Sequence, residues 1–172
     1  MLKNSLITLR AIEPEDIDFI YNIENNTDIW RVSDTFSPFS KHILKKYIES
    51  AHLNIFQTGQ LRLIIEENAT NTAVGTIELF DFDVFHQRAG IGVLIADDQQ
   101  KRKKFATNSI NLLTAYCKNT LGLNQIWCNI AESNTPSIKL FESLNFEKTG
   151  VKKKWNRTEN GFEDVFFYQK LL

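Results

Sequence analysis

The sequence contains few residues that form covalent cross-links, metal sites or flexible linkers. Of 172 residues, two are cysteine, three are proline and seven are glycine. Cys117 and Cys128 form no Cys-x-x-Cys pair, and the three histidines complete no zinc-binding pattern, so we expect no metal and a reducing, cytoplasmic location. Without a Pro/Gly/Ser-rich linker or a repeat, the chain is predicted to form a single domain over residues 1–172.

The sequence also lacks a long apolar run and a strong net charge. No apolar run approaches the ~20 residues of a membrane-spanning helix, and the N-terminus lacks the apolar segment of a signal peptide. We therefore expect no membrane partner. Lys and Arg number 20 against 21 Asp and Glu, which argues against a general nucleic-acid-binding protein. At 42% hydrophobic residues, the chain can bury a substantial core.

The near-zero net charge conceals an uneven distribution. Residues 1–40 hold seven acidic and three basic residues, whereas basic clusters occur at 101–104 and at 148–157. One interpretation is ordinary solvated surface charge. The other is a molecule that binds an anion at one place and a cation at another.

Hydrophobic periodicity predicts alternating strands and helices. Ser40 is a predicted N-cap for a helix whose apolar stripe reaches Ile55, Asn145 is predicted to end another helix in the left-handed conformation, and Asn160-Gly161 is predicted to form a hairpin turn. This order indicates a mixed α/β fold with helices on the faces of the sheet. We expect strands at 6–10, 61–66, 73–79, 89–96, 125–130, 151–155 and 163–171, with helices after Pro14 and Ser40, at 106–121 and after Asn134.

The junction after the 89–96 strand carries the clearest chemical signal. The chain runs from that strand through a basic loop into a helix, and backbone N–H groups at a helix N-terminus bind anions. Cationic residues at a helix start oppose the helix dipole, so we favour a bound pyrophosphate or phosphate over a solvated basic turn.

Two motifs here resemble those of the GNAT family of N-acetyltransferases. Residues 101–106, Lys-Arg-Lys-Lys-Phe-Ala, resemble the family's Gln/Arg-x-x-Gly-x-Gly/Ala loop, except that Lys101 and Lys104 replace Gln/Arg and the central Gly. Since Lys104 replaces Gly, we expect ordinary backbone angles there. Residues 134–146 resemble Asn-x-x-Ser-x-x-Leu-Tyr-x-x-Leu-Gly-Phe, with Phe141 for Tyr and Asn145 for Gly.

The resemblance implies a fold and a co-substrate. It implies a mixed, mostly antiparallel sheet of about six or seven strands, with helices on both faces and strands 4 and 5 splayed apart to admit acetyl-CoA. Backbone groups of the fourth strand would bind the pantetheine arm of acetyl-CoA. The basic loop and the start of a later helix would bind the remainder of the acetyl-CoA molecule. The implied acetyl-CoA residues are Val93, Leu94, Ile95, Lys101, Arg102, Lys103, Lys104, Phe105, Ala106, Thr107, Asn134 and Ser137.

Within the family, the sequence is most similar to spermidine and polyamine N-acetyltransferases, with ribosomal-protein N-terminal acetyltransferases as a neighbouring subgroup. The expected acceptor is a polyamine; the alternatives are a protein N-terminus and a non-catalytic acyl-CoA-binding module. Glu78 is the predicted base. The alternative is that Glu78 is only a solvent-facing residue of its strand, without a catalytic role. The predicted acceptor contacts are Glu24, Trp30, Asp81 and His86, and we also expect a possible homo-oligomer.

Three departures from the family pattern bear on the mechanism. Phe141 cannot donate the proton that the family's Tyr at this position supplies, and nothing in the sequence places Tyr116 or Tyr168 there. Gly90 stands where polyamine enzymes often have Glu, so one acidic contact is expected to be missing. No covalent intermediate is implied, and the two cysteines are interpreted as core thiols.

Overall fold

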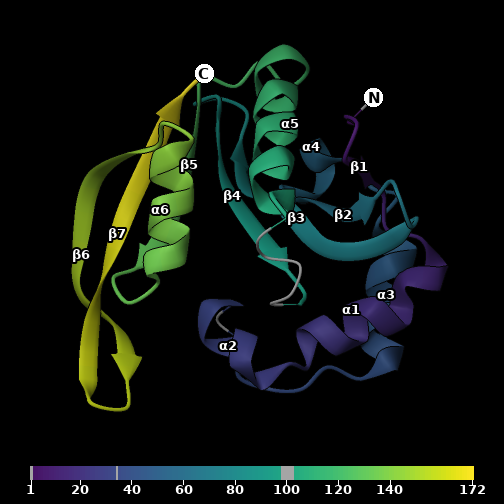
Figure 1. Cartoon of the computed structure of the whole chain (residues 1–172), viewed down its shortest axis with the longest axis horizontal. Coiled ribbons are helices and arrows are strands. Elements are labelled where there is room, and N and C mark those ends of the chain that lie inside the picture. Colours follow the sequence, from purple (N-terminus) through teal and green to yellow (C-terminus); the bar gives the residue numbers. More distant parts are fainter. Residues whose placement is uncertain (1, 34, 98–102) are drawn as a thin grey trace.

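The computed structural model describes residues 2–33, 35–97 and 103–172, and it contains one seven-stranded mixed sheet (Figure 1). The strand order is β1-β2-β3-β4-β5-β7-β6, and β4 and β5 are the parallel pair. This arrangement confirms the predicted mixed α/β fold. The strands are β1 (Ile7–Arg10), β2 (Leu61–Glu67), β3 (Thr72–Asp83), β4 (Arg88–Ile95), β5 (Gln125–Ala131), β6 (Glu147–Thr158) and β7 (Gly161–Leu171).

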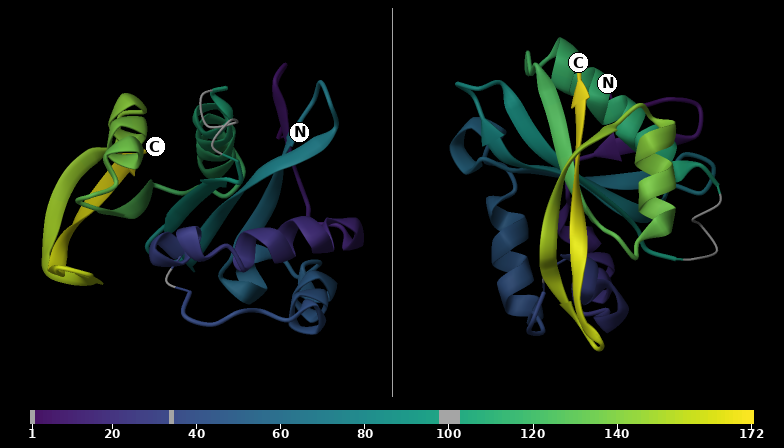
Figure 2. Two further views of the ribbon diagram at one scale, coloured as in Figure 1. Left: turned by 60° about the horizontal axis from the view of Figure 1, so that its bottom comes forward. Right: turned by 90° about the vertical axis from the view of Figure 1, so that its left-hand side faces the viewer.

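Helices pack on both faces of the sheet because the central strands are apolar on both faces. On one face, side chains of α5 and α6 join the main core with alternate residues such as Leu63 and Ile77. Helices α1 and α3 lie on the other face (Figure 2), where their side chains form a second cluster with Ile64. The helices are η1 (Pro14–Asp16), α1 (Ile17–Glu24), α2 (Thr27–Ser33), α3 (Lys41–Ser50), α4 (Ile55–Thr58), α5 (Phe105–Asn119) and α6 (Thr135–Ser143).

Strands β4 and β5 separate soon after they meet. Their pairing runs only from Arg88 opposite Gln125 to Gly90 opposite Trp127, although β4 continues to Ile95. Beyond Gly90 the two strands diverge (Figures 1 and 2). The predicted splay is therefore present, and it leaves the β5-facing backbone groups of the second half of β4 without a neighbouring strand.

The expected helix and turn signals are present in the structure. The Ser40 hydroxyl accepts a hydrogen bond from the Ile43 N–H at 3.3 Å, Asn145 is left-handed with φ 60°, and β6 and β7 meet at the turn before Gly161. The helix from Pro14 begins as a single 3₁₀ turn. Each of these local predictions is confirmed.

Two short helices and one helix end differ from the prediction. The helix that begins after Ser40 ends at Ser50, so Ile55 does not lie on its stripe. Ile55 instead starts α4, because Asn54 is the N-cap of this helix, Gln57 in its first turn completes a capping box, and Gly59 ends it with φ 70°. Helix α2 was also not predicted. Its seven residues are too few to show a helical period.

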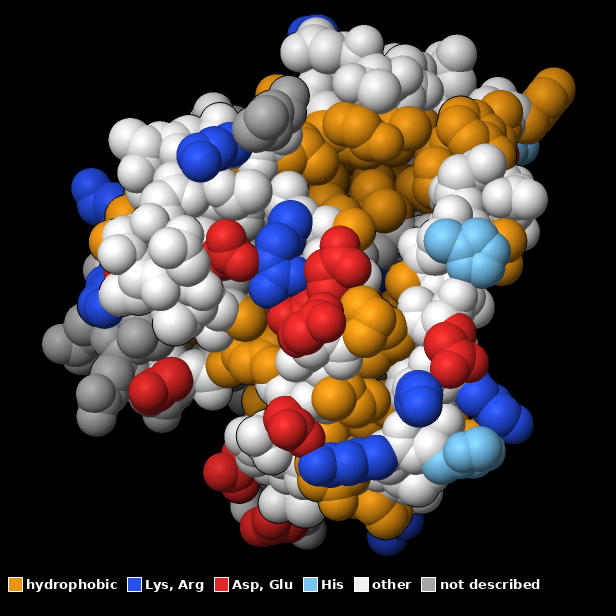
Figure 3. Space-filling view, turned by 90° about the vertical axis from the view of Figure 1, so that its right-hand side faces the viewer, with side chains coloured by type: hydrophobic (Ala, Val, Ile, Leu, Met, Phe, Trp, Pro, Cys, Tyr) orange, Lys and Arg blue, Asp and Glu red, His pale blue; other side chains and the backbone are white. Residues whose placement is uncertain are grey.

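Several acidic residues of the N-terminal region are occupied by structural ion pairs. Arg10 bonds both Asp16 at 2.7 Å and Glu66 at 2.6 Å, and Lys41 pairs with Asp18. On the face seen in Figure 3, basic and acidic side chains lie side by side near a hollow filled with hydrophobic side chains. Among the residues that the structure describes, three of the seven acidic residues in 1–40, namely Asp16, Asp18 and Glu24, therefore have a basic partner. In the described part of the chain, no helix is long and apolar enough to cross a membrane.

Candidate active site

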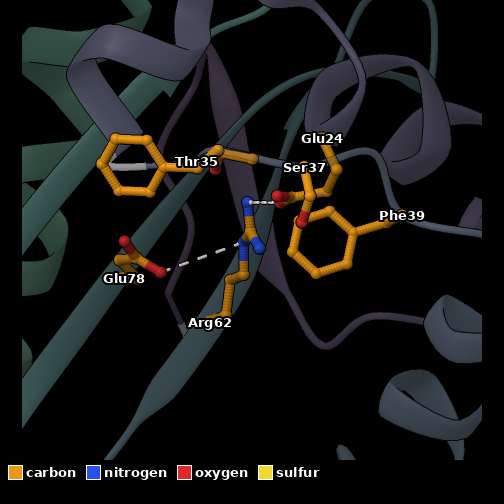
Figure 4. Close-up of a pocket in the computed structure, with 7 residues that line it drawn as sticks. Glu24, Thr35, Ser37, Phe39, Arg62 and Glu78 are labelled. Carbon is orange, nitrogen blue, oxygen red and sulfur yellow. Dashed lines mark ion pairs between the residues drawn. The ribbon is translucent and has the colours of Figure 1, made fainter.

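A cavity of about 470 Å³ brings together residues from four parts of the chain. Glu24 comes from the end of α1, Arg62 from β2 and Glu78 from β3, and the segment that joins α2 to α3 supplies the remaining wall (Figure 4). That segment contributes Thr35, Phe36, Ser37 and Phe39. The cavity therefore unites two residues predicted for the site, Glu24 and Glu78, with an arginine that was not predicted.

Strand alternation explains why Arg62 and Glu78 enter the cavity. Ile77 and Leu79 are fully buried in the main core, so Glu78 between them points to the opposite face. Leu63 is buried in the same core, which turns Arg62 to that face too. The two residues are direct partners in the β2–β3 ladder. They meet there as a cross-strand pair of opposite charge.

Arg62 lies between the two carboxylates (Figure 4). Its Nη2 is 2.6 Å from Glu24 Oε1, and its Nε is 4.0 Å from Glu78 Oε2. Burial lowers the pKa of Arg62, but the charges of Glu24 and Glu78 outweigh it, so this pKa lies above its ordinary value. Burial raises the pKa of the neighbouring Tyr47 hydroxyl, and the Arg62 charge opposes that shift. The guanidinium is thus a permanent cation.

Two glycines of β4 make room for side chains from β3. A Cβ on Gly90 would lie 2.3 Å from the Phe80 ring, and a Cβ on Gly92 would lie 3.2 Å from Glu78 Oε1. Phe80 in turn makes an edge contact with Trp127, with ring centroids 5.2 Å apart. The expected loss of an acidic contact at Gly90 is therefore accompanied by an aromatic ring in its place.

The start of α5 adopts the conformation that a glycine would normally supply. Lys104, which precedes the helix, is left-handed with φ 61° and ψ 17°. The expectation of ordinary backbone angles at this position is wrong: the loop keeps its turn although Lys has replaced Gly, at a cost of about 1 kcal/mol. The Nζ atom of Lys103 lies 3.8 Å from Oε1 of Glu67. Lys101 and Arg102 lie outside the described residues.

In the first turn of α5, backbone N–H groups are available to a ligand, whereas the Phe105 side chain belongs to the core. Asn108 N–H donates to the Lys104 carbonyl, so the N–H groups of Phe105, Ala106 and Thr107 precede the helical hydrogen bonds. The Phe105 side chain is fully buried in the core. Only its backbone can face a ligand, whereas Ala106 and Thr107 are partly exposed.

Helix α6 begins with a side-chain cap. The carboxamide oxygen of Asn134 accepts the Ser137 N–H at 3.2 Å. Phe141 is 4% exposed and packs edge-on against Phe146. The Tyr168 hydroxyl is committed to Glu142 at 2.9 Å; burial and that carboxylate raise its pKa to about 12.

The remaining predicted acceptor residues lie outside this cavity. Trp30 donates its indole N–H to the backbone carbonyl of Glu24 at 2.8 Å, so it contacts a cavity residue without lining the cavity itself. Asp81 lines a separate cavity of about 450 Å³ near the first residues of β4 and β5. His86 is exposed in the β3–β4 turn, where its ring contacts Phe85. The structure does not bring Asp81 and His86 to Glu78.

Sequence reasoning missed Arg62, although a signal was present. An arginine between Leu61 and Leu63, at the start of a strand whose first five residues are otherwise apolar, indicates a charge that needs a partner when it is buried. Tyr47, whose hydroxyl neighbours Arg62, was not among the predicted site residues either. Among the described residues, no group of three or more His, Cys, Asp or Glu side chains could hold a metal ion.

Comparison with known proteins agrees with this architecture. The family model described as "Acetyltransferase (GNAT) domain" matches residues 7–147. Spermidine N(1)-acetyltransferase of Vibrio cholerae is 30% identical over 149 residues, which cover 86% of this chain and 82% of that protein.

Solved structures of the same enzyme are similar along nearly the whole chain. The Vibrio cholerae spermidine N-acetyltransferase in complex with CoA and spermine has a TM-score of 0.86 at 26% identity, covering 98% of this chain and 96% of the other. Its dodecameric structure in an intermediate state has a TM-score of 0.79 at 27% identity, covering 98% and 95%. The splayed sheet, the carboxylate-lined cavity and these matches agree: the chain belongs to the GNAT acetyltransferase family and is an N-acetyltransferase that uses acetyl-CoA.

Proposed function

We propose that this N-acetyltransferase acetylates a primary amine of a polyamine such as spermidine. The observation that carries the proposal is the cavity in which Glu24 and Glu78 flank Arg62, because two carboxylates and one guanidinium leave a net charge of -1. The rings of Phe36 and Phe39 line the same cavity, and aromatic faces attract organic cations. The name of the Vibrio cholerae relative supports the same acceptor.

The proposed acetyl-CoA site follows the gap beside β4. Backbone groups of Val93, Leu94 and Ile95, which β5 does not pair, would bind the pantetheine arm. Lys103, Lys104 and the free N–H groups at the start of α5 would bind the phosphates, with Lys101 and Arg102 of the same loop. Asn134 and Ser137 at the start of α6 would contact the donor from the other side of the gap.

Glu78 is proposed as the base that takes a proton from the acceptor. A free primary amine has a pKa of about 10, so it is protonated near pH 7 and cannot attack a thioester until that proton is removed. The Glu78 side chain lines the cavity and is 33% exposed, which leaves it open to an amine or a water. A backbone N–H of β4 would polarise the thioester carbonyl.

The transfer is proposed to be direct, without an acetylated cysteine. Burial raises the pKa of Cys117 and Cys128 to about 12, so both stay protonated and unreactive. The leaving thiolate takes its proton from water, because Phe141 has no hydroxyl and the Tyr168 hydroxyl is bonded to Glu142.

Measuring CoA release with a panel of amines tests the proposal. Spermidine and related polyamines should be turned over with higher kcat/KM than peptides with free N-termini. Glu78→Gln should lower kcat by about a hundredfold or more, whereas Glu49→Gln on the exposed surface of α3 should not. A preference for peptides would show that the acceptor is a protein N-terminus and not a polyamine. Binding of acetyl-CoA without turnover of any amine would indicate a non-catalytic module.

We also propose that the chain assembles into a homo-oligomer, since the Vibrio cholerae relative has a dodecameric structure. Light scattering of the purified protein would measure its mass, and a monomer at micromolar concentration would contradict this. The cytoplasmic location stays a prediction.

A further inference from the structure

Arg62 is an unexpected residue in a cavity that is to receive a cation. Its side chain is only 16% exposed, and that of its partner Glu24 is 14% exposed. Its Nε is buried and has no hydrogen-bond partner among the described residues. Because a guanidinium keeps its proton in proteins, the cavity carries one fixed positive charge in every state of the reaction.

The two carboxylates beside Arg62 are not equivalent. Glu24 makes the short contact of 2.6 Å and is largely covered. Glu78 is 4.0 Å from Arg62, is twice as exposed, and accepts only a 3.4 Å hydrogen bond from Gln60 among the described side chains. The charge of Arg62 is therefore directed mainly at Glu24, and the charge of Glu78 faces the cavity.

We propose that Arg62 is a positioning residue for acetyl transfer: by neutralising Glu24 it leaves Glu78 as the carboxylate that receives the acceptor's ammonium group. The proposal rests on the proposed function and names the residue that sets the charge of its acceptor site. Without Arg62, two carboxylates of like charge would face the cavity and repel each other. The ammonium would then be shared between Glu24 and Glu78.

A purely structural role accounts less well for this arrangement. Groups from three elements face Arg62: Glu24 from α1, Tyr47 from α3 and Glu78 from β3. A well-packed apolar side chain between such elements is often as stable as a buried ion pair. The ion pair at this position therefore points to a use of the charge itself.

Two single variants separate the charge of Arg62 from its packing. Arg62→Gln leaves both carboxylates unpaired. The acidic limb, which is the fall of kcat/KM on the low-pH side of its pH profile, should therefore move up by about one pH unit. The KM for spermidine should fall at least threefold. Glu24→Gln frees Arg62 to pair with Glu78. In that variant the acidic limb should move down, and the KM should rise about fivefold.

The double variant is the decisive measurement. Glu24→Gln with Arg62→Gln restores a net charge of -1 with Glu78 alone, so its spermidine KM and acidic limb should return to within about twofold and 0.3 pH units of the wild type. Arg62→Lys should also retain the limb. Arg157→Gln, an exposed arginine on β6, is the matched control and should change neither quantity.

The outcomes distinguish this inference from the proposed function. Turnover of spermidine by the wild type tests the function; if another amine is the acceptor, the same cycle is run with that amine, and if none is acetylated both proposals fail. The positioning role would be overturned if the double variant kept the altered spermidine KM and acidic limb of Arg62→Gln, or if neither single variant changed these quantities. If Arg62→Gln does not fold, an unchanged KM and limb in Glu24→Gln would overturn it equally.

Discussion

Gly90 and Gly92 lie on the same face of β4, and each is covered by a side chain from β3. The Phe80 ring occupies the space above Gly90, and the Glu78 carboxylate lies above Gly92. The missing side chains of β4 are thus what allow an aromatic ring and a candidate base to lie flat against the sheet. The two glycines differ in what a methyl group would displace.

This difference predicts that alanine lowers the stability of the fold at Gly90 but lowers kcat at Gly92. Gly90→Ala must move the Phe80 ring from Trp127 and should lower the free energy of unfolding by about 1–3 kcal/mol. Gly92→Ala displaces only the flexible end of Glu78, so it should leave stability nearly unchanged but lower kcat. Urea unfolding and steady-state kinetics of both variants measure this. Equal loss of stability would show that the neighbours of Gly92 are as rigid as those of Gly90.

Phe141 offers a second residue-level prediction. Phe141→Tyr supplies a hydroxyl at the position where the GNAT motif that this segment resembles has Tyr, so kcat should rise roughly threefold or more as the thiolate gains a proton donor. Phe141→Leu is the control. Since Phe141 is 4% exposed, that change should lower stability without raising kcat. An unchanged kcat in Phe141→Tyr would mean that water already protonates the thiolate fast enough.

At the level of elements, helix starts set the proposed donor site. Helix α5 begins after a left-handed Lys104, and α6 begins with the cap from Asn134 to Ser137. The start of α5 leaves N–H groups unpaired, whereas at the start of α6 the N–H groups of Thr135 and Ser137 are bonded and Pro136 has none. The positions of both starts depend on local backbone geometry and on the divergence of β4 from β5, so stability and donor binding are linked at these two places.

Substitutions at Asn134 can separate the cap from the ligand contact. Asn134→Ala should lower the free energy of unfolding by about 1 kcal/mol. Asn134→Asp keeps the cap but adds a negative charge, so it should leave stability unchanged and raise the Kd for CoA severalfold. Ser40→Ala removes a comparable cap from α3. It should lower stability without changing the Kd, and equal CoA affinity in all three variants would remove Asn134 from the donor site.

On the scale of the whole molecule, the sheet consists of two parts that are joined by few hydrogen bonds. Strands β1 to β4 form one part, and β5, β7 and β6 form the other. They meet over three residue pairs of β4 and β5. A ligand that binds in the gap would contact both parts and would therefore stabilise the folded state as a unit.

Acetyl-CoA should accordingly raise the thermal midpoint. At about 100 times its Kd, a ligand adds about 2.7 kcal/mol, which corresponds to a rise of roughly 5–10 °C for a domain of this size. Replacing Lys103 and Lys104 together with Gln should reduce the shift at equal ligand concentration. The same replacement of Lys152 and Lys153 on β6 should not. No shift in the wild type would contradict acetyl-CoA binding in the gap.

The predictable parts of the site were those that a short stretch of sequence encodes. Glu78 was predicted from the resemblance to polyamine acetyltransferases, Asn134 from its capping position, and Asn145 from its tolerance of positive φ. Lys104 was misjudged because surrounding structure imposed a left-handed angle that its own preference opposes. Helix α4 was missed because four residues with a capping box carry no period.

What the sequence determined by itself was local: the order of the strands and longer helices, several caps and turns, and the motifs that resemble the GNAT family. Each depends on contacts within a few residues, so it can be seen without the fold. Only the tertiary structure decided that Glu24 and Glu78 meet around Arg62 while Asp81 and His86 lie elsewhere. That choice depends on strand register and on the packing of α1 and α3, because these long-range contacts join residues far apart in the chain.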